Sequence, residues 1–85
     1  MSNKPSRFKT TIDGRSFTIV GRKSQEHMRV VSDLINDELT ELKKVTRSLD
    51  NEERAILLAI NAKSEQLEMQ KKVIELEEKL KNLSE

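Results

Sequence analysis

The sequence TTIDGRSFTIV, residues 10–20, places an Asp13-Gly14 pair between two short runs rich in β-branched and aromatic residues. Runs of this composition favour β-strands, and Asp-Gly suits the two positive-φ positions of a type I′ turn. The stretch therefore predicts a β-hairpin with Asp13 and Gly14 at its tip.

The register of this hairpin follows from its turn, because a two-residue loop makes its two flanking residues a pair. The predicted pairs are Ile12 with Arg15, Thr10 with Phe17, and Phe8 with Ile19. Since strand side chains alternate between faces, one face collects the apolar residues Phe8, Ile12, Phe17 and Ile19. An isolated hairpin is marginal in water, so this one must lie on a helix or join another chain's sheet.

Two helices are predicted after the hairpin. The first has Ser24 as its N-cap, and its apolar residues recur at spacings of three or four: Met28, Val31, Ile35, Leu39 and Leu42. A break is expected in residues 46–50. The second helix is predicted from about residue 51 to 83, because neither proline nor glycine interrupts that range, and it would be roughly 50 Å long.

The predicted fold class is therefore α+β: an N-terminal hairpin, a medium helix and a long C-terminal coiled-coil helix. We divide the chain into a flexible tail (1–7), a head (8–50) and the long helix (51–85). Only 34% of the 85 residues are apolar and two are aromatic, so a single copy has little to bury. Small chains without disulfides or metals commonly gain stability by oligomerisation, and an oligomer is expected here.

Two apolar stripes run along the long helix. The first follows the alternating four-three spacing of a coiled-coil seam, and the second is displaced from it and repeats every seven residues. Burying both requires more than one neighbouring helix, which favours a four-helix arrangement; the alternative is that the second stripe is a scatter of exposed apolar residues. The predicted oligomerisation residues are Ala59, Ile60, Ala62, Leu67, Met69, Val73, Ile74, Leu76, Leu80 and Leu83.

Residues that could carry catalysis or hold a metal are scarce. There is no cysteine, and His27 is the only histidine, so a zinc-type site lacks ligands and His27 is interpreted as an exposed early-helix residue. Gly14 and Gly21 begin no phosphate-binding loop. We therefore predict a non-enzymatic chain without a cofactor or metal. No apolar run is long enough to cross a bilayer, and the N-terminus has no signal-peptide pattern, so a cytoplasmic location is expected.

The chain resembles the ZapA family of bacterial cell-division proteins over about residues 8–80. Three strings carry the resemblance: TIDGRSFTIVG in the hairpin, MRVVSDLINDELTEL in the first helix and LLAINAKSEQLE opening the second. It implies binding to filaments of the tubulin-like GTPase FtsZ at the division septum, where the filaments are cross-linked and the Z-ring stabilised. It also implies a homodimer through the heads and an antiparallel tetramer through the long helices.

The resemblance further implies that basic residues of the head contact the filament. The matching positions are Arg15 at the hairpin tip and Lys43 and Arg47 at the end of the first helix, with Lys44 beside them. Read from the residues alone, Arg15 is more simply an ordinary solvated residue next to a turn, and only with the resemblance are the two interpretations equally supported. Asn61, inside the apolar stretch AILLAINA, either fixes the helix register as a buried amide or merely flanks the seam.

Two other functions compete with filament cross-linking. The basic cluster at the end of the first helix could contact nucleic acid, with the coiled coil as dimeriser. The net charge of only +1 weighs against it, as does the poor support for base stacking, because Phe8 and Phe17, the only aromatic residues, are needed for packing. The chain could also be a coiled-coil scaffold for another cytoplasmic protein.

Overall fold

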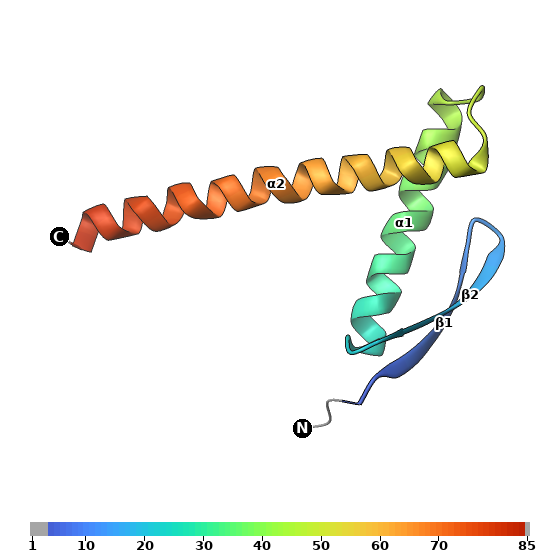
Figure 1. Cartoon of the computed structure of the whole chain (residues 1–85), viewed down its shortest axis with the longest axis horizontal. Coiled ribbons are helices and arrows are strands. Elements are labelled where there is room, and N and C mark those ends of the chain that lie inside the picture. The colour runs from blue at the N-terminus through green and yellow to red at the C-terminus, as the bar shows by residue number, and fades with distance from the viewer. Residues whose placement is uncertain (1–3, 85) are drawn as a thin grey trace. The chain divides into compact units, whose positions relative to one another are not determined.

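The computed structural model describes residues 4–84 and contains a hairpin followed by two helices (Figure 1). The elements are strands β1 (Ser6–Ile12) and β2 (Arg15–Gly21) and helices α1 (Gln25–Val45) and α2 (Asn51–Ser84). They form two compact units, residues 1–50 and residues 51–85. The predicted order of a hairpin, a medium helix and a long helix is confirmed.

The hairpin has the predicted turn and register. Asp13 and Gly14 both have positive φ, 52° and 75°, as a type I′ turn requires. The strands pair antiparallel, with Ile12 opposite Arg15 and Phe8 opposite Ile19. The dipeptide at the tip therefore decides which side chains share a face.

Strand β1 begins earlier than the sequence indicated. The flexible tail was expected to extend to residue 7, but Ser6 pairs with Gly21 and Arg7 with Val20. The Ser6 hydroxyl also donates to the Gly21 carbonyl, at 3.5 Å. Each added pair contributes to the ladder, so pairing continues until β2 ends at Gly21. Residues 1–3 of the expected tail lie outside the described residues.

Helix α1 packs against β1. Its N-cap is Ser24, as predicted, and the Ser24 side chain accepts from the His27 backbone N–H at 3.0 Å. Leu39 and Ser32 are its buried residues, and the Ser32 hydroxyl lies 2.5 Å from that of Thr10. Helix and hairpin are thus joined by both apolar and polar contacts.

Strand β2 makes much less contact with α1 than β1 does. Contacts between α1 and the sheet are made to β1. Phe8, Ile12 and Ile19 are partly buried, whereas Phe17 on the same face remains 45% exposed. Val30 and Leu34 of α1 are also more than half exposed. The apolar face predicted for the hairpin is therefore only partly covered within one chain.

The two glycines of the hairpin should respond differently to substitution. Gly14→Ala is expected to lower stability by about 1–2 kcal/mol, because an L-residue is strained in the left-handed region, although a Cβ there meets no atom within 4 Å. Gly21→Ala is the matched control: its added Cβ also meets open space, and its φ lies outside that region. Thermal denaturation followed by circular dichroism measures both. Equal melting temperatures for the two variants would contradict the turn assignment.

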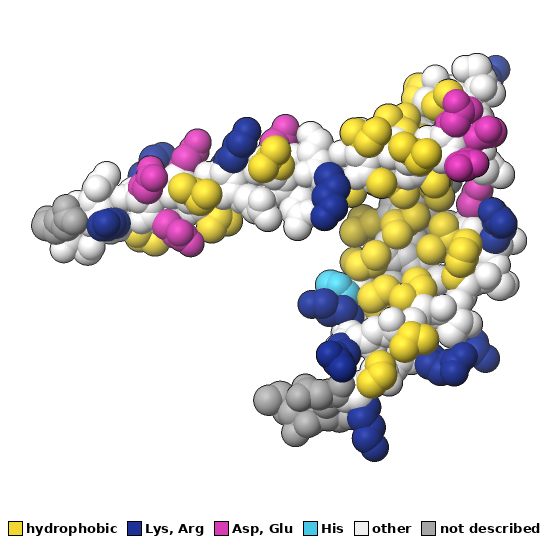
Figure 2. All heavy atoms as spheres, in the orientation of Figure 1, with side chains coloured by type: hydrophobic (Ala, Val, Ile, Leu, Met, Phe, Trp, Pro, Cys, Tyr) yellow, Lys and Arg dark blue, Asp and Glu magenta, His cyan; other side chains and the backbone are white. Residues whose placement is uncertain are grey.

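Helix α2 is one unbroken helix of 34 residues with no buried side chain. At 1.5 Å rise per residue it is about 51 Å long. Hydrophobic side chains emerge along its length (Figure 2). A helix in a protein gains most of its stability by packing its apolar face against another element. The exposed apolar side chains of α2 are therefore suited to packing against a partner.

Candidate partner-binding surfaces

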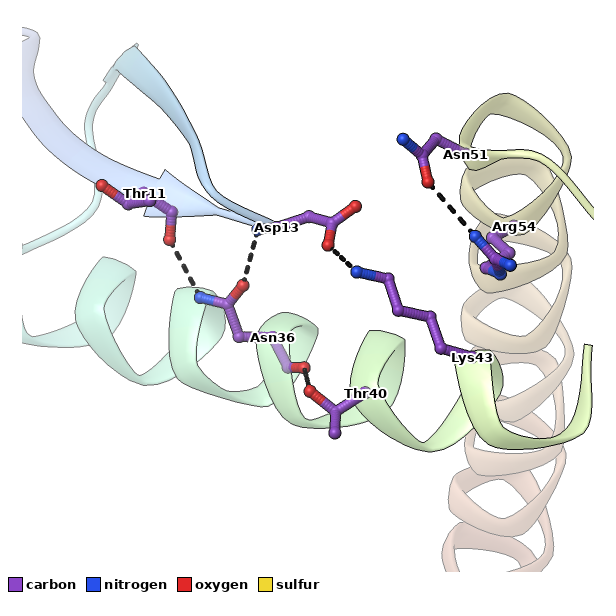
Figure 3. A network of polar contacts seen from close by, with 7 residues as sticks. All are labelled: Thr11, Asp13, Asn36, Thr40, Lys43, Asn51 and Arg54. Carbon is purple, nitrogen blue, oxygen red and sulfur yellow. Dashed lines mark hydrogen bonds and ion pairs between the residues drawn. The ribbon is translucent and has the colours of Figure 1, made fainter. Parts of the chain in front are cut away.

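A polar network holds the tip of the hairpin to α1 (Figure 3). The Asn36 side chain accepts from the Asp13 backbone N–H and donates to the Thr11 carbonyl, both at 3.0 Å. The Lys43 ammonium forms an ion pair with the Asp13 carboxylate. These contacts hold the turn at two places along α1, Asn36 and Lys43. They therefore also position the residues that follow the turn.

Asn36 is the residue that sequence reasoning missed. It lies next to the apolar position Ile35, and nothing in the helical pattern distinguishes it from a solvated polar residue. Its role depends on residues 25 and 23 positions away along the chain, Thr11 and Asp13. Only the placement of the hairpin on α1 reveals it.

The predicted filament-contacting residues lie on the hairpin and at the end of α1. Arg15 opens β2 and is exposed, and Arg47 is exposed in the turn after α1. Lys44 forms an ion pair with the exposed Glu41 at 3.1 Å. Lys43 forms an ion pair with Asp13. Through the Asp13 ion pair, the structure brings Lys43 next to the turn that precedes Arg15.

These four residues differ in how freely they can meet a partner. No ion pair to another residue of the range 4–84 involves Arg15 or Arg47. Lys43 shares its charge with Asp13, so its attraction for an acidic partner is reduced. Lys44 has only a solvent-exposed pair, which contributes little and is easily exchanged. Arg15 and Arg47 are therefore the two unpaired cations of the predicted set.

The predicted oligomerisation residues lie on α2 and are open to solvent. Ala59 and Ala62 are exposed, and every larger apolar member is more than half exposed. Met69 and Val73 of the first stripe and Ile74 of the second border one shallow hollow, together with Gln66, Gln70 and Glu77. The hollow lies between the two stripes. Asn61 lies on the same helix and is partly buried.

Metal-binding geometry is absent from the part of the chain that the structure describes. No three His, Cys, Asp or Glu side chains in residues 4–84 are placed to hold an ion together. His27 is exposed in the first turn of α1.

None of the helices in residues 4–84 combines the length and the apolar character that a bilayer crossing requires.

Comparison with known proteins assigns the chain to a family. The sequence pattern described as "Cell division protein ZapA" matches residues 9–85. The chain is 39% identical over 75 residues to the Cell division protein ZapA of Bacillus subtilis, an alignment covering 86% of this chain and 88% of that one. It is 34% identical over 82 residues to the protein of that name from Geobacillus kaustophilus, covering 95% and 90%.

A solved structure has the same fold. It is described as a ZapA mutant dimer from Geobacillus stearothermophilus, and it matches with a TM-score of 0.78 and 31% identity. The match covers 94% of this chain and 93% of that one. With the hairpin, the two helices and nearly the whole sequence matched, the chain belongs to the ZapA family of cell division proteins.

Proposed function

We propose that this protein is a non-enzymatic cross-linker of FtsZ filaments, acting in the cytoplasm at the division septum to promote and stabilise the Z-ring. The observation that carries the proposal is α2, a helix of 34 residues that has no buried side chain and carries two apolar stripes. A surface of this kind is built for association with other helices. Membership of a cell-division family supports a partner in cell division, and the family resemblance implies that this partner is the FtsZ filament.

Assembly through both stripes gives the protein more than one filament-binding head. The heads form a homodimer, and the description of the solved relative as a dimer supports self-association. Two dimers then join through their long helices, because Leu67 and Ile74 of the second stripe need a neighbour beyond the one that covers the seam. The antiparallel orientation is the one that the family resemblance implies. Each complete assembly carries four heads.

Filament recognition is assigned to Arg15, Lys43, Lys44 and Arg47 of the head. An exposed ion pair contributes only about 0.2–1 kcal/mol, so one head binds weakly. Linked heads meeting a polymer of repeated sites bind with an effective concentration that multiplies these weak contacts. The assembly therefore binds polymer in preference to free subunits.

The test is co-sedimentation of the protein with FtsZ in GTP and in GDP, together with light scattering. We expect the protein to pellet, and scattering to rise, only where filaments assemble. A protein that stays in the supernatant while filaments form at low salt would overturn the proposal. Retention of a nucleic acid or of another cytoplasmic protein instead would support the alternatives of a nucleic-acid-binding dimer or a scaffold.

Arg15→Ala combined with Arg47→Ala is expected to reduce filament binding by roughly tenfold or more. Two pairs of up to about 1 kcal/mol each are lost from every head, and several heads act together. Co-sedimentation over a range of protein concentrations measures the change. Lys72→Ala on α2 is the control, since it removes a positive charge outside the head. Equal loss in the control would show a general charge effect in place of a defined contact.

A further inference from the structure

The outer edge of β2 is open. In an antiparallel pair, residues alternate between exchanging hydrogen bonds with their partner and pointing N–H and C=O away. Ile12 and Arg15 flank the type I′ turn and bond each other, so the outward groups of β2 belong to Ser16, Thr18 and Val20. We call the backbone groups of these three residues the open edge. No hydrogen bond from any other residue between 4 and 84 reaches them.

Hydrogen bonds along the opposite edge of the hairpin, formed by β1, support this assignment of the outward-pointing groups. They also show that the β1 edge is covered. Arg7 and Thr11 are the cross-strand partners of Val20 and Ser16. Their carbonyls accept from the Gln25 side chain at 3.1 Å and from the Asn36 side chain at 3.0 Å. Helix α1 thus covers one edge of the hairpin and leaves the other bare.

The open edge also lacks the devices that usually prevent strand addition. Exposed edges are commonly blocked by proline, by lysine, by a bulge or by a covering segment. Here the edge residues are Ser, Thr and Val, the ladder is regular over seven pairs, and Ser16, Thr18 and Val20 are all exposed. A strand that can pair and is left unblocked is a template for an extended segment.

The face of the hairpin turned away from α1 is basic. Arg7 and Lys9 of β1 are exposed on it, opposite Val20 and Thr18, and we call this pair the basic face. Residues 4–23 contain six basic side chains and one acidic one, Asp13. The Asp13 carboxylate is already occupied by Lys43. No carboxylate competes for Arg7 and Lys9 within the hairpin.

We propose that the open edge of β2 binds an extended, acidic segment of a partner protein by strand addition. The segment would lie about 4.8 Å beyond β2 and hydrogen-bond to Ser16, Thr18 and Val20. Every second side chain would face the same way as the basic face. Lys9 and Arg7 are long enough to reach those side chains across Thr18 and Val20, so carboxylates are favoured at alternate positions.

The observations favour an acidic peptide over a second copy or a nucleic acid. Two β2 strands paired antiparallel about Thr18 would set Ser16, Thr18 and Val20 of one copy against the same three residues of the other. A second copy therefore brings no carboxylate to the strand next to the open edge, where an acidic segment would bring several. A nucleic acid has no backbone that can complete the alternating N–H and C=O groups of a strand edge. Peptide binding goes beyond filament bundling and is measured without filaments.

The experiment uses the full chain labelled with ¹⁵N and a capped eight-residue peptide of alternating glutamate and threonine. We expect the amides of Ser16, Thr18 and Val20 to shift on titration and to exchange more slowly with solvent. Replacing the glutamates by lysine should abolish binding, and raising the salt concentration should weaken it.

Variants at Thr18 isolate the strand edge. Thr18→Pro removes one outward N–H while leaving the β1 ladder intact, a change that edge strands tolerate, and it should weaken peptide binding roughly five- to tenfold. Thr18→Val keeps the N–H and should bind as the parent does. Arg7→Glu with Lys9→Glu tests the basic face without touching the edge, and should also weaken binding at least fivefold.

Three results would overturn the proposal. Open-edge amides already protected without peptide, at concentrations where the chain self-associates, would assign the edge to a second copy. If the Thr18→Pro variant folds and binds the peptide as tightly as the parent, charge attraction alone accounts for peptide binding. Binding of a single-stranded oligonucleotide at the basic face, with none of the peptide, would assign that face to nucleic acid.

Discussion

Leu67→Lys combined with Ile74→Lys is expected to halve the mass of the assembly, from four chains to two, and to abolish filament bundling. Both residues belong to the second stripe and are more than half exposed in the single chain. Burying such a side chain contributes about 1.5–3 kcal/mol, and the loss is repeated in every copy. Sedimentation equilibrium measures the mass, and light scattering with assembled FtsZ measures bundling.

Substitutions on the other two faces of α2 make this prediction specific. Val73→Lys with Leu76→Lys disrupts the seam and should remove helix association altogether, with a loss of helical circular dichroism because a solitary helix is marginal. Glu68→Lys with Glu75→Lys lies away from both stripes by the 3.6-residue repeat and should leave the mass unchanged. That control adds more positive charge than either test pair, so a retained mass excludes charge as the cause.

An unchanged mass for Leu67→Lys with Ile74→Lys would show that the second stripe faces water. If that unchanged mass is two chains, the assembly is a simple two-stranded coil. Bundling by such an assembly would have to arise from the heads alone.

Asn36→Leu is expected to lower the stability of the head by about 2 kcal/mol and its melting temperature by roughly 10 °C. Leucine has a similar shape but forms neither of the two hydrogen bonds that hold Asp13 and Thr11, and each is worth about 1 kcal/mol. Calorimetry or circular dichroism measures the change. Filament binding, assayed below the new melting temperature, should fall as well, because the turn before Arg15 is no longer held.

Two further variants test the role of Asn36. Asn36→Asp keeps the acceptor for the Asp13 N–H and loses the donor to Thr11, so about half of the loss is expected. Asp37→Ala, at the exposed neighbouring position, should change stability by less than about 0.5 kcal/mol. A melting temperature for Asn36→Leu equal to that of Asp37→Ala would show that the polar network contributes nothing to the stability of the head.

Much of the fold could be predicted from local chemistry. Asp13-Gly14 determines both the turn and the register, because few residue pairs adopt positive φ at two successive positions. Ser24 marks the start of α1, and its apolar spacing marks the helix itself. The start of β1 could not be predicted, because Ser6 and Arg7 are polar and pair only because β2 extends far enough to meet them.

The candidate filament-binding residues could also be predicted only in part from the sequence. Arg15, Lys43, Lys44 and Arg47 were predicted as filament contacts from the family resemblance, and no sequence pattern indicated which of them form ion pairs. Asp13 occupies Lys43, and this contact joins residues 30 positions apart. The sequence does not show whether a charged residue forms an ion pair with an opposite charge far away along the chain. Arg15 and Arg47 could therefore be distinguished from Lys43 only in the folded head.

The sequence by itself determined the turn, the strand register, the N-cap of α1 and the two stripes of α2, because each depends on neighbours within a few residues. Only the tertiary structure decided that α1 covers the β1 edge and leaves the β2 edge open, and that Asn36 holds the turn. Those outcomes depend on which edge of the hairpin meets the helix. Side-chain alternation is the same for both edges of a two-stranded sheet, so no local pattern distinguishes them.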